Sequence, residues 1–128
     1  MTSAAILFHM LDPDEGFQAV PGYPNGITER ILSGSLDQNA KRGHRTRLVR
    51  FTPGARTTDP FVHDYHEEVT LLSGDLTEGA DANGEGGVRY DRPAFGYRPP
   101  GTTHGPFRSE DGCLLLETHW YNDAATEG

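Results

Sequence analysis

The side chains best suited to chemistry are histidines and carboxylates gathered in one short stretch, His63-Asp64-Tyr65-His66-Glu67-Glu68. Imidazole nitrogen and carboxylate oxygen both bind divalent zinc, iron, manganese and nickel. The composition of this stretch therefore indicates a candidate metal site around His63, His66 and Glu67. The alternative interpretation is an exposed polar junction between two strands.

Short β-strands separated by turns are the elements that must position these side chains. The 128 residues include 16 glycines and 9 prolines, and only 34% of the residues are hydrophobic. Glycine and proline breaks without a helical period predict an antiparallel sandwich or barrel with no strong helix. Strands are expected at residues 27–36, 46–51, 60–63, 69–72, 88–90, 94–97 and 113–121.

A chain of 128 residues has the length of a single domain. We expect an extended N-terminal arm with one short strand over residues 1–26, a barrel over 27–121 and a tail over 122–128. The strand at 69–72 is expected to stop at Ser73-Gly74.

Strand geometry ranks the candidate ligands, because successive side chains point to opposite faces. Glu67 shares a face with Val69 and Leu71, so all three point into the barrel if the apolar pair does. His66 lies on the other face and would have to reach a metal from the turn before the strand.

Two stretches resemble the sequence motifs of the cupin superfamily, also called RmlC-like. Glu67 precedes Gly74 by seven positions, as in the E-x6-G half of the first motif, and Pro99-x-Gly101-x2-His104 matches the core of the second. The Glu67-Glu68 pair and Gly112-Cys113 are similar to the small ChrR-type and acetylacetone-cleaving cupins. The resemblance covers roughly residues 26–119.

This resemblance implies a fold, a site and a cofactor. The fold would be an all-β double-stranded β-helix, or jelly roll. One divalent metal would lie inside the barrel, with His63, Glu67 and His104 as ligands. Iron(II) is the expected metal, with zinc, manganese and nickel as alternatives.

The departures from the motifs leave one ligand position open. Phe61 stands where the first histidine of the HxH pair is expected, and phenylalanine cannot bind a metal. Arg108 and Pro93 replace the asparagine and the first glycine of the second motif. The fourth position is therefore assigned to His66 or to a water or substrate molecule, and a chain without metal is the remaining alternative.

Further side chains are expected near this site or packed beside it. Tyr97 and Arg98 lead into the Pro99-Pro100-Gly101 turn, where a cupin pocket would be lined, and they are the candidate catalytic residues. Glu117 and His119 share a face of the last strand, and we expect them to form a surface pair rather than an inward one. Cys113 is expected to be a small buried hydrophobe.

The net charge and the lengths of the apolar runs indicate which classes of partner are not expected. The formal net charge is −8 and no basic patch carries interleaved aromatic residues, so nucleic acid is not expected. No apolar run approaches the roughly 18 residues of a membrane span. The basic cluster from Lys41 to Arg50 is interpreted as a solvated hairpin end rather than an anion site. A single cysteine and the lack of a signal-peptide pattern lead us to expect a cytoplasmic protein.

These observations favour an enzyme that acts on a small-molecule substrate. The expected activity is that of a metal-dependent oxygenase of the dioxygenase type, with a small carbonyl or phenolic substrate. Isomerisation, cyclisation or elimination at the same metal is one alternative, and a zinc-binding ChrR-like sensor domain without catalysis is another. We expect a homodimer in which the N-terminal arm covers an open sheet edge.

Overall fold

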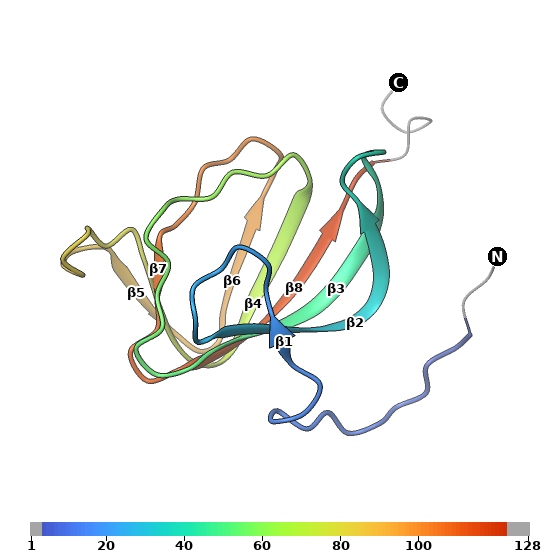
Figure 1. The fold of residues 1–128 in the computed structure, drawn as a ribbon, viewed down its shortest axis with the longest axis horizontal. Coiled ribbons are helices and arrows are strands. Elements are labelled where there is room, and N and C mark those ends of the chain that lie inside the picture. The colour runs from blue at the N-terminus through green and yellow to red at the C-terminus, as the bar shows by residue number, and fades with distance from the viewer. Residues whose placement is uncertain (1–3, 123–128) are drawn as a thin grey trace.

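The computed structural model describes residues 4–122, in which an arm without strands at residues 4–17 leads into a set of antiparallel strands (Figure 1). No helix occurs among these residues, which confirms the all-β prediction, and none is therefore available to cross a membrane. The strands are β1 (Gln18–Ala19), β2 (Ile27–Asp37), β3 (Arg42–Phe51), β4 (His66–Glu78), β5 (Val88–Asp91), β6 (Ala94–Arg98), β7 (Phe107–Arg108) and β8 (Cys113–Trp120).

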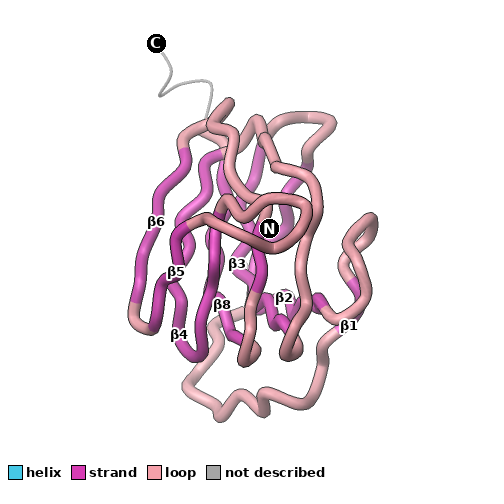
Figure 2. The backbone as a smooth tube through the Cα atoms, turned by 90° about the vertical axis from the view of Figure 1, so that its left-hand side faces the viewer, coloured by secondary structure: helices cyan, strands magenta, loops and turns pink. Residues whose placement is uncertain are grey.

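Two sheets share the long strand β4. The first sheet runs β1-β2-β3-β8-β4, and β6 pairs with the other edge of the first half of β4. The second half of β4 leaves this sheet and pairs with β5 and β7. Figure 2 shows the strands curving around a common interior. This is the jelly-roll arrangement that the sequence predicts.

Gly74 is where β4 passes from one sheet to the other, so the expected stop of the strand at Ser73-Gly74 is wrong. The register against β8 shifts between Leu71 and Ser73, and Gly74 has a φ of 79°. A Cβ at this position would lie 1.8 Å from the carbonyl oxygen of Gly112. Glycine lets the chain bend here while the strand continues, as in a β-bulge.

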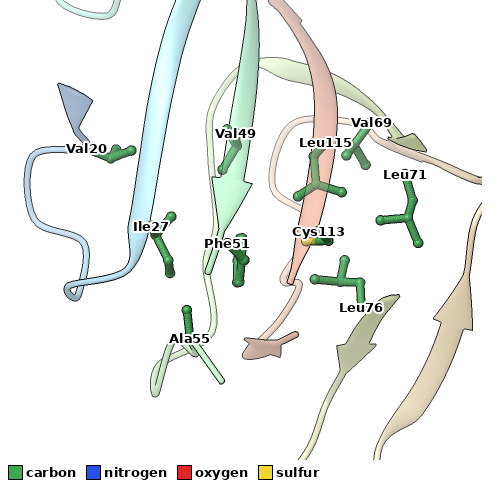
Figure 3. Packing of buried hydrophobic residues seen from close by; sticks show 10 residues of the cluster. All are labelled: Val20, Ile27, Val49, Phe51, Ala55, Val69, Leu71, Leu76, Cys113 and Leu115. Atoms are coloured by element: carbon green, nitrogen blue, oxygen red, sulfur yellow. The ribbon is translucent and has the colours of Figure 1, made fainter. Parts of the chain in front are cut away.

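The core lies between the two sheets (Figure 3). Its buried members are Val20, Ile27, Val49, Phe51, Ala55, Val69, Leu71, Leu76, Cys113 and Leu115. Val20 comes from residues 18–26, which the sequence assigns to the arm, and β1 in the same stretch pairs with β2. The end of the arm thus contributes to the barrel. Most of the predicted tail, 123–128, lies outside the described residues.

The candidate strand at residues 60–63 is a single β-bridge rather than a strand. Phe61 and His104 exchange backbone hydrogen bonds, with N–O distances of 2.6 and 2.9 Å. The two-residue strand β7, which the sequence does not predict, follows shortly after. This bridge joins two loops that are more than 40 residues apart, and it positions two histidines of the candidate site.

Candidate metal site

Three potential ligands converge inside the barrel from separate segments. Glu67 lies on the inward face of β4, and its neighbours Val69 and Leu71 on that face are buried, as the alternation predicts. His63 precedes β4, and His104 follows the Pro99-Pro100-Gly101 turn. Each of His63, Glu67 and His104 offers one ligand atom, and these three atoms lie within 4.8 Å of one another. The structure therefore brings together the three residues that the cupin resemblance singles out.

His104 is oriented for coordination by a backbone group. Its Nδ1 lies 3.0 Å from the carbonyl oxygen of Thr102, which can only accept, so Nδ1 carries the hydrogen. In the neutral ring Nε2 then carries the free lone pair, and it lies 3.5 Å from Oε1 of Glu67. Two donors bound at about 2.1 Å to one ion lie about 3.0 to 3.4 Å apart in octahedral or tetrahedral geometry. A small closure would bring both atoms to bonding distance.

Two ring contacts position His63, and its imidazole can bind a cation without first losing a proton. Its ring stacks on Tyr65 with a centroid distance of 4.6 Å and meets the edge of His104 at 5.0 Å. Burial lowers the pKa of His63 to about 4, and the attraction of Glu67 only partly offsets this effect. The imidazole is neutral at pH 7, which is the form that coordinates metals.

Arg98 faces this group, whereas Tyr97 does not. Nη1 of Arg98 donates to Oε1 of Glu67 at 3.3 Å, and Nη2 lies 3.7 Å from Glu78. The guanidinium also lies over the ring of Phe107. Tyr97, one residue earlier on β6, points to the outer face and is 49% exposed. Of the two candidate catalytic residues, the structure places only Arg98 beside the carboxylate.

His66 lies on the outer face of β4, away from the other candidate ligands. Its Nδ1 is 2.8 Å from the hydroxyl of Tyr97, and its ring stacks on Trp120 with a centroid distance of 5.1 Å. His66 and Glu67 are successive residues of β4, so their side chains point to opposite faces of the strand, which explains this placement. His66 belongs to neither group of described residues whose ligand atoms converge.

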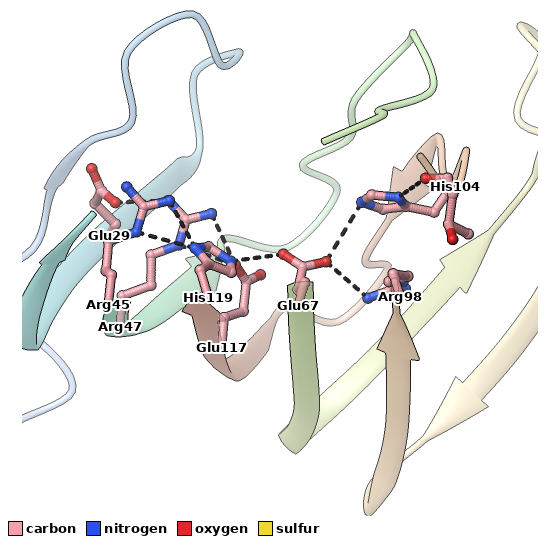
Figure 4. A network of polar contacts seen from close by, with 9 residues as sticks. Glu29, Arg45, Arg47, Glu67, Arg98, His104, Glu117 and His119 are labelled. Carbon is pink, nitrogen blue, oxygen red and sulfur yellow. Dashed lines mark hydrogen bonds and ion pairs between the residues drawn. The ribbon is translucent and has the colours of Figure 1, made fainter. Parts of the chain in front are cut away.

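The expectation of a surface pair at Glu117 and His119 is wrong. Both side chains point inward from β8, with exposed fractions of 8% and 0%. Nε2 of His119 lies 2.8 Å from Oε2 of Glu67 and 3.2 Å from Oε1 of Glu117 (Figure 4). Period-two alternation places them on the face of Leu115 and Cys113, which is the core face. That signal was available in the sequence.

An arginine neutralises Glu117, so the view of the basic cluster as a solvated hairpin end holds for Lys41 and Arg42 but is wrong for Arg47. Arg47 is only 5% exposed, and its Nε and Nη2 donate to Oε1 of Glu117 at 3.0 and 2.8 Å. Nη1 of the same residue donates to Glu29 at 2.8 Å. Burial alone would raise the pKa of Glu117, but the charge of Arg47 and the hydrogen bond from His119 hold it well below its usual range.

Aromatic side chains form the wall of a small cavity at the site. Phe61 stacks on Tyr23 with a centroid distance of 5.2 Å and lies 6.0 Å from the rings of both His63 and His104. The residue that replaces a motif histidine thus becomes an apolar wall. Tyr23 comes from the arm, and no spacing in the sequence identifies it as part of the site. The space enclosed is about 40 Å³.

A larger hollow adjoins this cavity. It has a volume of about 210 Å³ and is lined by residues of β4, β5, β6 and β8. Val69, Leu76, Arg98 and Leu115 line both spaces. The cavity that holds the carboxylate and its two histidines thus shares a wall with a space large enough for a small organic molecule, with Arg98 at the boundary.

The sequence of the chain matches one known protein family. Residues 17–123 match the sequence model of the ChrR Cupin-like domain. No protein with a curated description matches the chain.

Solved structures with the same fold include three proteins, each 18% identical in sequence. An acetylacetone dioxygenase from Acinetobacter johnsonii has a TM-score of 0.65, with 97% of this chain and 83% of that chain covered. The polyketide cyclase RemF from Streptomyces resistomycificus has a TM-score of 0.63, with coverages of 90% and 80%. KdgF from a Halomonas species has a TM-score of 0.62, with coverages of 91% and 96%. At this identity the likeness establishes the fold alone.

Proposed function

Because the chain belongs to the family of ChrR cupin-like domains, we propose that it is a metal-dependent cupin enzyme whose divalent cation is held by His63, Glu67 and His104. The observation that carries this proposal is the convergence of two imidazoles and one carboxylate beside an open hollow. Three protein ligands leave positions free for a substrate, as in catalytic rather than structural sites. Two histidines and one carboxylate are also the donor set of non-haem iron oxygenases.

Iron(II) is the metal that we assign to this donor set, with zinc, manganese and nickel as competitors for the same ligands. A bound divalent metal supplies Lewis-acid polarisation of substrate oxygen atoms, and iron additionally supplies redox chemistry with dioxygen. The donor chemistry fits such an ion, because Nδ1 of His104 is engaged by the backbone, which leaves Nε2 as the nitrogen that faces Glu67, and His63 is neutral at pH 7.

The chain's own residues would bind and orient a small carbonyl or phenolic substrate. The apolar walls of the 210 Å³ hollow would take its carbon skeleton, while the cavity wall at Phe61 limits the access of water. The guanidinium of Arg98, 3.3 Å from Oε1 of Glu67, is placed to donate to an enolate or phenolate oxygen. Oxygenation of such a substrate is the proposed reaction, and isomerisation or elimination through the same enolate would need the same contacts.

The family match also supports a second candidate function, a zinc-binding sensor domain. A structural zinc site is closed by four protein ligands. The number of ligands is therefore the quantity that separates the two functions. X-ray absorption of the zinc-loaded protein should show two histidines, one carboxylate and water. Four protein ligands would favour the sensor.

Metal content tests the proposed ligands directly. Protein purified without added metal should contain about one divalent ion per chain. His104→Ala and Glu67→Gln should remove most of it, because each deletes one of three ligands. His66→Ala is the matched control, since it deletes a histidine on the outer face of the same strand, and its metal content should equal that of the parent.

Unchanged metal content in His104→Ala and Glu67→Gln would reject the site. The oxygenase assignment has a separate test, in which protein loaded anaerobically with iron(II) is exposed to oxygen together with diketones or catechols. Oxygen consumption that depends on one of these compounds is expected. Product formation without oxygen consumption would instead indicate the non-redox reaction.

A further inference from the structure

His119 is the one histidine of the described chain that is completely buried yet is not among the proposed ligands. It lies in a row across the first sheet. Arg45 on β3 is its neighbour on one side, and Glu67 on β4 is its neighbour on the other. Inward side chains of three adjacent strands thus form a continuous line of contacts that ends at the candidate metal site (Figure 4).

The contact with Arg45 determines which nitrogen of His119 carries the hydrogen. Nε and Nη2 of Arg45 lie 3.1 and 2.7 Å from Nδ1 of His119. A guanidinium has only donors, so Nδ1 must accept. The hydrogen therefore resides on Nε2, which donates to Oε2 of Glu67 at 2.8 Å and lies 3.2 Å from Oε1 of Glu117.

This tautomer has two consequences for metal binding. Nε2 has no lone pair for a metal, although His119, Glu67 and Glu117 also form a group with converging ligand atoms. Glu117 is in addition bound by Arg47 through two hydrogen bonds, so two arginines already satisfy this group. The group is therefore a support for the neighbouring site rather than a second metal site.

We propose that Arg45 and His119 are positioning residues that make Glu67 a one-oxygen ligand. His119 holds Oε2 of Glu67, which leaves Oε1 turned toward Nε2 of His104 at 3.5 Å. A carboxylate that binds through one oxygen leaves a coordination position open that a two-oxygen carboxylate would fill. This inference rests on the proposed function, because it concerns how the same site keeps room for a substrate.

The first test uses metal-free protein and so does not depend on metal binding. Long-range ¹H–¹⁵N correlation spectra of the histidine rings report which nitrogen bears the hydrogen. The parent should show His119 protonated at Nε2, and Arg45→Met should lose this single tautomer because Nδ1 no longer has an obligatory donor. Arg50→Met is the matched control, since Arg50 also lies on β3 but pairs with Asp14 at the surface.

The second test measures cobalt(II) affinity by competition with a chelator. Loss of an outer hydrogen-bond partner of a ligand typically weakens binding about 10- to 100-fold. We expect losses in this range for Arg45→Met and His119→Leu, and none for Arg50→Met. His119→Gln should restore most of the affinity, because its amide can accept from Arg45 and donate to Glu67. A merely structural role for His119 would not predict this rescue.

Three results would overturn the inference. One is His119 protonated at Nδ1 in the parent, and another is cobalt affinity in Arg45→Met equal to that of Arg50→Met. The third is complete loss of cobalt in both His119→Leu and His119→Gln with a native near-ultraviolet circular dichroism spectrum, which would make His119 a ligand. If the parent binds no cobalt, the proposed function fails, while the tautomer in metal-free protein still decides whether Arg45 sets the state of His119.

Discussion

Glu67 meets two different sets of partners through its two carboxylate oxygens. Oε2 accepts from His119, whereas Oε1 faces His104 and Arg98. The cupin resemblance implies that Glu67, His63 and His104 form one group, and their ligand atoms do converge, while strand alternation by itself points only Glu67 inward. The sequence left His66 as a candidate fourth ligand and predicted His119 at the surface, whereas the structure buries His119 beside Glu67 and leaves His66 on the outer face. The face of the strand decided between them, and the apolar residues next to His119 carried that information.

Cys113 provides a residue-scale prediction, because it is the only cysteine and its thiol is buried. Burial raises the pKa of Cys113 from 9.0 to about 11. Its thiolate fraction at pH 8 is then about 100-fold below that of an exposed thiol. Ellman's reagent should react with the native protein at least about 100-fold more slowly than with protein in guanidinium chloride. Equal rates would contradict the burial of this side chain.

The raised pKa of Cys113 also makes the free energy of unfolding depend on pH in the alkaline range. The folded state holds the thiol proton more tightly than the unfolded state, so this contribution is complete below about pH 9. It is lost as the pH rises from about 9 to about 11. Urea unfolding at several pH values should show this loss in the parent, and Cys113→Ala should lack that part of it.

At the scale of elements, the bend of β4 at Gly74 is the feature on which the two-sheet arrangement depends. The sequence marks the position with a glycine but predicts a stop there. A strand end and a bulge both call for glycine, and only the partner strands on either side distinguish them. The short strand expected in the arm is β1, whose position the sequence does not give, and β7 is not predicted at all. Both are two residues long, and so short a strand leaves no alternation pattern to detect.

Substitution at this bend should be far more costly than at an ordinary turn glycine. Gly74→Ala puts a Cβ against the carbonyl oxygen of Gly112 at a φ of 79°, and we expect a loss of about 3 kcal/mol or more. Gly54→Ala is the matched control, with a φ of 83° and nothing within 4 Å of the new Cβ, and it should cost about 1 kcal/mol. Urea denaturation gives both values. Similar losses for the two variants would show that the contact with Gly112 is not important.

For the whole molecule, the N-terminal arm carries apolar side chains that its own barrel does not cover. Leu7, Phe8 and Met10 are 82%, 109% and 96% exposed. The sequence leads us to expect a homodimer, and these side chains would be buried by a second copy of the chain. Large exposed apolar surface of this kind is characteristic of interaction sites.

A double variant tests this expectation. Phe8→Asp with Met10→Asp should shift the protein from dimer to monomer in sedimentation velocity, with the thermal unfolding of the barrel retained. Gln38→Glu with Asn39→Asp adds the same charge to an exposed hairpin loop and should leave the dimer intact. A parent that sediments as a monomer at all concentrations would contradict the expected dimer.

The bridge between Phe61 and His104 also affects how fast a metal could leave. Strand β4 is hydrogen-bonded on both sides along most of its length, so its amide protons should exchange with solvent only when the whole barrel opens. His104 is attached by two backbone hydrogen bonds to another loop, and such a contact opens locally at much lower free energy. Metal release would then follow the opening of the loop at residues 99–106, while Glu67 stays in place to receive the next ion.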